Sequence, residues 1–152
     1  MFALKTSAQD PYSQNFSITN GLPSNSIYSI LQDKNGFIWF TCDEGLFRYD
    51  GTYFKSFRSP EQTSYSGSSI LEDIYGRIWY MDFDGNAFYL QNNKVKRFPQ
   101  KLSSSYYQLK ATKSVIFIHE KNDVIAIDLK TLKEIKRFKI GQLIYSCEVL
   151  ND

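Results

Sequence analysis

Residues 33–40 read DKNGFIWF, and the same pattern returns forty positions later as DIYGRIWY over residues 73–80. Both stretches place Gly three residues and Trp six residues after an Asp, and an aromatic residue directly follows Trp. A repeat period between about 20 and 50 residues is typical of solenoids and propellers. An aromatic content of 16% also favours β-structure. The repeat therefore indicates the fold class before any single residue is considered.

Turn residues divide the first unit into four expected strands. Asp33 to Gly36 is a hairpin signal, because Asp can accept bonds from nearby amides and Gly can adopt positive φ. Further turns are expected at residues 43–45 and 50–51. The expected strands are residues 27–32, 37–41, 46–49 and 53–58. The unit is therefore predicted to be a four-stranded antiparallel meander.

Two further units follow the first. The second runs over residues 69–98, with Gly45 matched to Gly85 and Tyr49 to Tyr89. The third is degenerate, with expected strands at 106–111, 114–119, 124–128 and 132–139 and with Phe117 or a neighbour in place of Trp.

The predicted fold class is all-β, a propeller segment of about three four-stranded antiparallel blades in an incomplete ring, since propellers contain about 4–8 blades. The expected divisions are an N-terminal extension, three blades and the first strand of an unfinished blade: 1–15, 16–58, 59–98, 99–140 and 141–152. Because residues 149–152 align with 30–33 and then stop, we expect native residues beyond Asp152. Expressed alone, the chain is expected to be marginally stable or self-associating.

The N-terminal extension has two interpretations. Thr6-Ser7-Ala8 before Gln9 is similar to the end of a secretory signal peptide, although no apolar stretch precedes it. An ordinary frayed terminus is the alternative. No run approaches the roughly 18 apolar residues of a membrane span, so membrane attachment is expected only through segments outside this sequence.

Charge is distributed unevenly along the chain. Residues 1–92 hold 6 basic and 10 acidic side chains, whereas residues 93–139 hold 12 basic and 4 acidic ones. A basic face could attract sulfated sugars, phosphate or nucleic acid. The lysines alternate with apolar residues over 94–98 and 133–138, however, which favours edge strands whose lysines block strand addition. No nucleic-acid partner is predicted.

The first unit resembles the two-component regulator propeller repeat. The resemblance is carried by FSITNGLP at 16–23, IYSILQD at 27–33, GFIWFT at 36–41, GLFRYDG at 45–51 and FKSF at 54–57. It is close in the first blade, partial in the second and weak over 104–152. Asn86-Ala87, where the first unit has Leu46-Phe47, departs from the pattern.

This resemblance implies a function. Proteins with these repeats are typically bacterial sensors, common in the Bacteroidetes, whose periplasmic propellers precede a membrane helix and a histidine kinase or transcriptional output domain. The chain is accordingly expected to be an extracytoplasmic ligand-sensing fragment that responds to an oligosaccharide or similar ligand. Its expected partners are that ligand, the remaining blades and signalling domains, and a second copy in a homodimer. The alternative is a propeller scaffold for protein–protein interaction.

Catalytic chemistry is not indicated. A Ser-His-Asp or Cys-His arrangement would depend on His119, the single histidine, which we interpret instead as a strand-end residue beside a turn. Cys42 and Cys147 are expected to stay unpaired thiols. The Asp-x-x-Gly-x-x-Trp unit is similar to the sialidase Asp-box with a different Asp–Gly spacing, but no acid pair for a glycosidase stands out. No enzymatic activity and no catalytic residue are predicted for this chain.

Binding residues are equally hard to assign. The stretch DFDG at 82–85 is similar to part of a calcium loop, but the other ligands at EF-hand spacing are absent, so no metal or cofactor is predicted. Trp39 and Trp79 could stack on sugars; their equivalent positions favour packing between blades. The ligand-binding residues are left unassigned.

Overall fold

The computed structural model describes residues 13–102, 108–120 and 122–141. Within them the chain forms one short 3₁₀ helix, η1 (Ile18–Asn20), and three sheets of four strands. The strands of blade one are β1 (Ile27–Gln32), β2 (Ile38–Cys42), β3 (Gly45–Tyr49) and β4 (Phe54–Phe57). Those of blade two are β5 (Gly67–Glu72), β6 (Ile78–Asp82), β7 (Asn86–Gln91) and β8 (Lys94–Lys101). Those of blade three are β9 (Gln108–Ala111), β10 (Val115–His119), β11 (Asp123–Asp128) and β12 (Glu134–Lys139).

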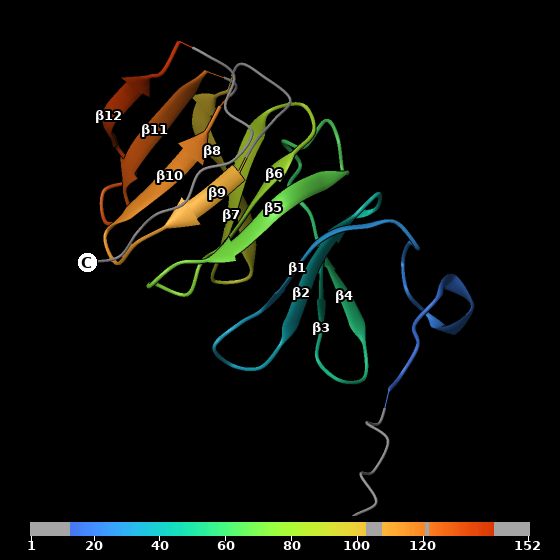
Figure 1. Ribbon diagram of the computed structural model, residues 1–152. Coiled ribbons are helices and arrows are strands. Elements are labelled where there is room, and N and C mark those ends of the chain that lie inside the picture. The colour runs from blue at the N-terminus through green and yellow to red at the C-terminus, as the bar shows by residue number, and fades with distance from the viewer. Residues whose placement is uncertain (1–12, 103–107, 121, 142–152) are drawn as a thin grey trace, which may run out of the picture.

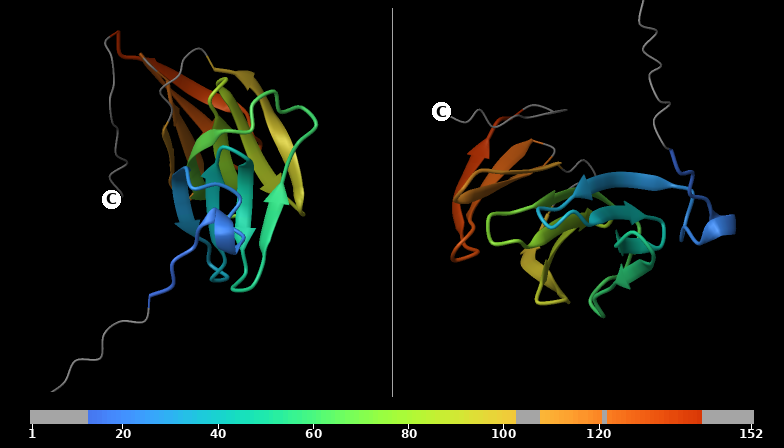
Figure 2. Two further views of the ribbon diagram at one scale, coloured as in Figure 1. Left: turned by 90° about the vertical axis from the view of Figure 1, so that its right-hand side faces the viewer. Right: turned by 90° about the horizontal axis from the view of Figure 1, so that it is seen from below.

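Each sheet is an antiparallel meander in which every strand pairs with the next strand along the chain. The expected strands agree with the observed ones to within a few residues at their ends, and the predicted fold class is confirmed. The three sheets lie side by side like the blades of a fan, and the ring is open (Figures 1 and 2). β5, the first strand of blade two, contacts both β1 and β9, the first strands of its neighbours.

The hairpins between the first and second strands of blades one and two are equivalent. Gly36 and Gly76 adopt φ values of 86° and 73°, which lie in the region that favours glycine. In each turn the glycine N–H donates to the carbonyl of the preceding Asp at 2.9 Å. The turn chemistry expected from Asp-x-x-Gly is therefore confirmed.

The next turn corrects the sequence alignment by one residue. Trp39 pairs with Arg48, whereas Trp79 pairs with Tyr89. The turn between β6 and β7 is thus one residue longer than that between β2 and β3, so the predicted equivalences of Gly45 with Gly85 and of Tyr49 with Tyr89 are wrong. The extra residue also explains the apparent departure at 86–87, because the ladder aligns Phe47 with Phe88.

Apolar side chains fill the spaces between neighbouring blades. One core contains Trp39, Leu46 and Phe57 of blade one with residues of blade two; a second contains Trp79, Phe98 and residues of blade three. Both tryptophans are essentially buried, with 3% and 0% of their surface exposed. Their interpretation as interblade packing residues is confirmed.

Hydrogen bonds from a backbone N–H to a serine hydroxyl also repeat between the blades. The Ser29 hydroxyl accepts a bond from Ile70 N at 3.2 Å, and forty residues later the Ser69 hydroxyl accepts one from Leu109 N at 2.7 Å. Each bond joins the first strand of one blade to the first strand of the next. The blades are therefore tied at the inner strands by hydrogen bonds and further out by apolar packing.

Blade three keeps the plan with different residues. Its first turn is organised by Thr112, whose hydroxyl accepts bonds from Ser114 N at 3.3 Å and Val115 N at 3.1 Å. Phe117 occupies the ladder position of the tryptophans, as expected. Val115 O accepts a bond from Thr112 N, just as Phe37 O accepts one from Asp33 N in blade one. The residue two positions further along is Phe117 in blade three and Trp39 in blade one. β8 and β12 are the last strands of their sheets, in agreement with the edge-strand interpretation of the lysines.

The segment before β1 covers the free face of blade one. The Phe16 ring meets those of Tyr49 and Phe54 at centroid distances of 5.0 and 5.5 Å. Leu22 packs against the Phe40 cluster on the same face. Most of the N-terminal extension and nearly all of the expected unfinished blade at 141–152 lie outside the described residues.

In the described ranges, no helix has the length and apolar character to cross a membrane.

Candidate functional site

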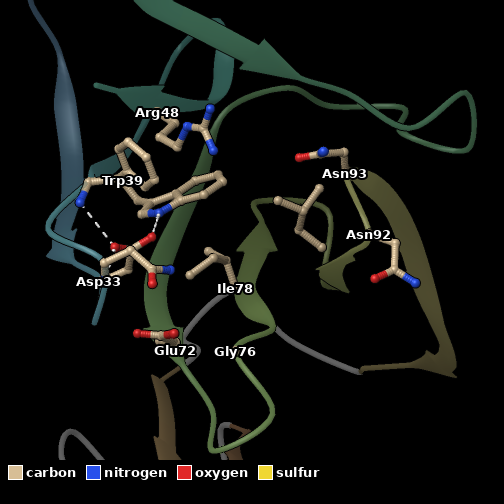
Figure 3. A pocket seen from close by; sticks show the side chains of 11 residues that line it. Asp33, Trp39, Arg48, Glu72, Gly76, Ile78, Asn92 and Asn93 are labelled. Carbon is tan, nitrogen blue, oxygen red and sulfur yellow. Dashed lines mark hydrogen bonds between the residues drawn. The ribbon is translucent and has the colours of Figure 1, made fainter. Parts of the chain in front are cut away.

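A pocket opens between blades one and two, at the end of the blades where the first hairpins and the last turns lie. It encloses about 220 Å³. Figure 3 shows side chains from both blades converging on it. Its walls combine apolar and polar side chains: Asp33, Asn35, Phe37, Trp39, Arg48, Glu72, Gly76, Ile78, Leu90, Asn92 and Asn93.

Asp33 builds one wall and has little capacity left for a ligand. One carboxylate oxygen accepts Asn35 N at 2.9 Å and Phe37 N at 3.0 Å, and the other accepts Trp39 Nε1 at 2.7 Å. Buried carboxylates are stable when such donors satisfy them. The Asp thus fixes both the turn and the orientation of the indole.

Asp73 repeats this arrangement in blade two and adds a buried ion pair. It accepts Tyr75 N at 2.9 Å, Arg77 N at 3.0 Å and Trp79 Nε1 at 2.8 Å. Arg77 Nε lies 2.5 Å from the same carboxylate, and its Nη2 donates to Leu129 O of blade three at 2.6 Å. At this second junction the guanidinium is bonded on both sides.

Arg48 is the positively charged side chain in the lining of the pocket. Its guanidinium carbon lies 4.4 Å from the Phe37 ring centroid and 5.6 Å from that of Trp39. Among the described residues, no carboxylate comes within 4 Å of it, and its buried Nε has no hydrogen-bond acceptor. The guanidinium is held by cation–π contacts and its other donors are available to an acceptor.

The rim of the pocket connects the two blades. Glu72 accepts Lys34 N at 2.8 Å and lies 3.7 Å from Lys34 Nζ. On the opposite rim Asn92 and Asn93 adopt φ values of 53° and 59°, and both side chains are exposed. Asn93 extends toward the Arg48 side in Figure 3. Positive φ explains why asparagines occupy this turn, because Asn tolerates that region better than most residues, but it does not by itself signal a ligand.

The pocket suits hydrogen bonding to a small polar group above an apolar wall.

The residues considered earlier for catalysis lie elsewhere. His119 is buried in blade three with 1% exposed, and burial lowers its pKa. It ends β10, as the strand-end interpretation predicted.

Cys42 is a buried free thiol whose pKa is raised by burial. Its expected unpaired state therefore agrees with the structure. Cys147 lies outside the described residues.

The calcium-like stretch forms a buried hydrogen-bonded turn. Asp82 is 0% exposed and accepts Asn86 N at 2.7 Å and Asn86 Nδ2 at 2.8 Å. Asn86 in turn accepts Arg97 Nη2 at 2.6 Å. Over the described ranges, no group of three or more potential ligands is placed to hold a metal ion.

Comparison with known families identifies the repeat. Residues 21–44, from the turn after η1 through β2 and the following turn, match the two component regulator propeller family. The chain carries a two-component regulator propeller repeat. The matched residues include Asp33, Gly36 and Trp39, so the turn that builds the pocket wall belongs to the repeat itself.

Solved structures show the same fold. The extracellular domain of the hybrid two component system BT4673 from B. thetaiotaomicron superposes with a TM-score of 0.71 at 20% identity, covering 87% of this chain and 19% of that one. The corresponding domain of BT3049 gives 0.68 at 22%, covering 81% and 20%. Virginiamycin B lyase from Staphylococcus aureus gives 0.66 at 17%, covering 79% and 43%.

This chain thus spans about a fifth of the sensor domains and less than half of the lyase. At these identities the likeness concerns the fold, and because the lyase is an enzyme, the fold alone does not decide between sensing and catalysis. No curated protein matches the chain.

Proposed function

We propose that this chain is part of the extracytoplasmic, ligand-sensing propeller of a two-component signalling protein, with an oligosaccharide or similar small molecule as ligand. The match of residues 21–44 to the two-component regulator propeller repeat carries the proposal. The likeness to extracellular domains of two component systems supports it. In this proposal the propeller lies in the periplasm and its output domain lies elsewhere in the parent protein.

Binding is favoured over catalysis by the state of the acidic groups around the pocket. The buried Asp33 accepts bonds from three N–H donors, which occupy three of its about four acceptor positions, and Glu72 is bonded to Lys34. A general acid or base needs a proton that it can exchange with substrate. The groups that stay available, Arg48 and the amides of Asn92 and Asn93, bind without reacting.

A junction between blades is also a suitable place for a sensor. The pocket has walls from two blades, and a ligand that contacts both changes the relative stability of arrangements in which the blades differ in spacing or angle. A ligand can shift such an equilibrium only by its difference in affinity for the two arrangements. Contacts to both blades provide that difference.

Thermal unfolding in the presence of defined oligosaccharides tests the proposal. A ligand that binds the folded chain raises its melting temperature in a concentration-dependent way. We expect one class of oligosaccharide to do so, while sorbitol and unrelated oligosaccharides at equal concentration leave the transition unchanged. If no oligosaccharide stabilises the chain and a protein partner binds it instead, the scaffold function replaces this proposal.

A further inference from the structure

The opposite end of the blades carries a second group of exposed side chains. Because each blade is an antiparallel meander, the turns between second and third strands share this end with the connections between blades. Three aromatic residues near these loops stay exposed: Tyr28, Tyr65 and Phe83, at 44%, 43% and 44%. Tyr28 comes from the start of β1, and Phe83 from the turn between β6 and β7.

Tyr28 and Phe83 meet across the junction of blades one and two. Their ring centroids are 5.0 Å apart and their planes are inclined by 81°, the edge-to-face geometry that aromatic pairs prefer. Phe83 N donates to Ser66 O at 3.1 Å, which fixes the backbone of the turn. Two apolar surfaces at nearly right angles are therefore held in place and open to solvent.

An ionised carboxylate stands beside these rings. Asp43 accepts the Tyr28 hydroxyl at 2.5 Å with one oxygen and the Ser24 hydroxyl at 3.1 Å with the other. The bond from Tyr28 and bonds from Ser26 and Ser24 lower the pKa of Asp43. Each carboxylate oxygen has a second acceptor position, and the side chain is exposed.

Nearby charges make the surface unsuitable for anions. Asp84 accepts the Thr63 hydroxyl at 2.8 Å, and Glu44 is paired with Arg58 at 3.3 Å. Arg58 lies over the Tyr65 ring, 4.3 Å from its centroid. With Arg58 engaged by Glu44 and Tyr65, the carboxylates of Asp43 and Asp84 set the local potential, which disfavours sulfated or uronic sugars.

A neutral sugar ring has an apolar C–H face and a rim of hydroxyl donors, and this surface offers a counterpart to each. Rigid aromatic rings supply contact area at low entropic cost, and a carboxylate forms charge-assisted hydrogen bonds with hydroxyls. We infer that Tyr28 and Phe83, with the Asp43 carboxylate, form a binding subsite for a neutral sugar ring. This inference rests on the proposed sensing function and gives it a location distinct from the Arg48 pocket.

Isothermal titration with neutral tetrasaccharides of glucose, xylose and mannose tests the subsite on the chain itself. For the sugar that binds, Tyr28→Ala and Phe83→Ala should each weaken affinity by about tenfold, as expected for the loss of a stacking surface. Asp43→Asn should weaken it by about threefold or more because the charge-assisted bond is lost. Tyr53→Ala, which removes a 73% exposed aromatic beside the last turn of blade one at the opposite end, should leave affinity within about twofold. A single cooperative melting transition for each variant without sugar shows that the fold is intact.

Three results would overturn the inference, and they have different consequences for the proposed function. If none of the tetrasaccharides or other oligosaccharides binds, both fail. If a sugar binds Phe83→Ala and Tyr28→Ala as tightly as the wild type but fails to bind Arg48→Met, sensing stands and the ligand belongs in the pocket. If choline binds more tightly than any sugar and is lost in Phe83→Ala, the rings and carboxylate form a site for cations.

Discussion

Blades one and two each place an arginine and an aromatic residue beside their tryptophan, but the two residue types exchange positions. In blade one the residue two before Trp39 is Phe37, and the ladder partner of Trp39 is Arg48. In blade two the residue two before Trp79 is Arg77, and the ladder partner is Tyr89. Each junction therefore stacks one guanidinium on aromatic rings, although the arginine comes from a different strand.

The exchange has a consequence for the two junctions. Arg77 reaches both Asp73 and the Leu129 carbonyl, and only 6% of its side chain is exposed. Among the described residues Arg48 forms no ion pair within 4 Å, its charge acts on Asp50 only electrostatically, and it lines an open pocket. The same repeat thus gives a sealed junction in one place and an accessible one in the other, and this difference can be tested by substitution.

The largest effect is expected at the sealed junction. Asp73→Asn leaves the Arg77 guanidinium buried without its counter-charge. The amide has only one acceptor oxygen, so its N–H₂ group faces some of the donors that the carboxylate accepted, among them Trp79 Nε1. Removing one partner of a buried ion pair costs about 3–5 kcal/mol. Urea unfolding should show this loss in the free energy of unfolding, and the double variant Asp73→Asn with Arg77→Met should recover part of it. Equal stability of Asp73→Asn and the wild type would contradict the role of the pair.

Asp33→Asn is the matched substitution at the open junction and should cost less. It weakens the same bonds to the turn amides and to the indole, but no buried arginine is left unpaired. The loss of a buried hydrogen bond that leaves its partner unsatisfied costs about 1–3 kcal/mol. The same urea titration measures it, and an Asp33→Asn loss larger than that of Asp73→Asn would reverse the comparison.

Arg48→Met should have the smallest effect on stability. The substitution removes cation–π contacts, each of which contributes about 0.5–1 kcal/mol at a partly exposed site. Met retains apolar contact with Phe37, and the buried Nε that has no acceptor is no longer present. We expect a change in unfolding free energy below about 1 kcal/mol. A loss comparable to that of Asp73→Asn would mean that Arg48 is a structural residue rather than an available one.

The second turns of the two blades also differ, and pH separates them. The pKa of Asp82 is raised by burial, whereas the pKa of Asp43 is lowered, chiefly by its bond from Tyr28. Asp82 contributes stability that is present below its ordinary value of 3.8 and is lost as pH rises through its raised pKa. Asp43 contributes stability that is present above 3.8 and is lost as pH falls through its lowered pKa. Carboxyl NMR titration should place the two midpoints on opposite sides of 3.8; midpoints in the reverse order would contradict the structure.

Much of the fold could be predicted because the repeat is explicit in local chemistry. Asp33, Gly36 and Trp39 act within one turn, so their spacing alone predicts hairpin, strand and buried indole. The one-residue shift between Gly45 and Gly85 escaped prediction because either glycine can end a turn with positive φ. Only the strand pairing shows which residue is extra.

The candidate site could not be predicted because it depends on contacts between blades. Arg48 lies in the GLFRYDG stretch of the repeat and Asn93 lies in a turn, but neither position indicates a ligand, and their neighbours are set by how two sheets pack. The meeting of Tyr28 with Phe83 joins residues 55 positions apart across a junction that no local pattern describes. The sequence indicates the blades, whereas the surfaces between them depend on how the blades pack.

Trp39 and Trp79 hold neighbouring blades together, and the Asp of its own turn binds each indole N–H and keeps it from solvent. Hydrogen exchange of the two indole Nε1–H groups, followed by NMR in D₂O, tests this arrangement most directly. Both N–H groups donate to a carboxylate at 2.7 and 2.8 Å and both rings are buried, so both should exchange far more slowly than an exposed indole. Asp33→Asn should accelerate exchange at Trp39 more than at Trp79. Exchange of both indoles at the rate of a free indole, or rapid exchange that a bound sugar slows, would contradict the account.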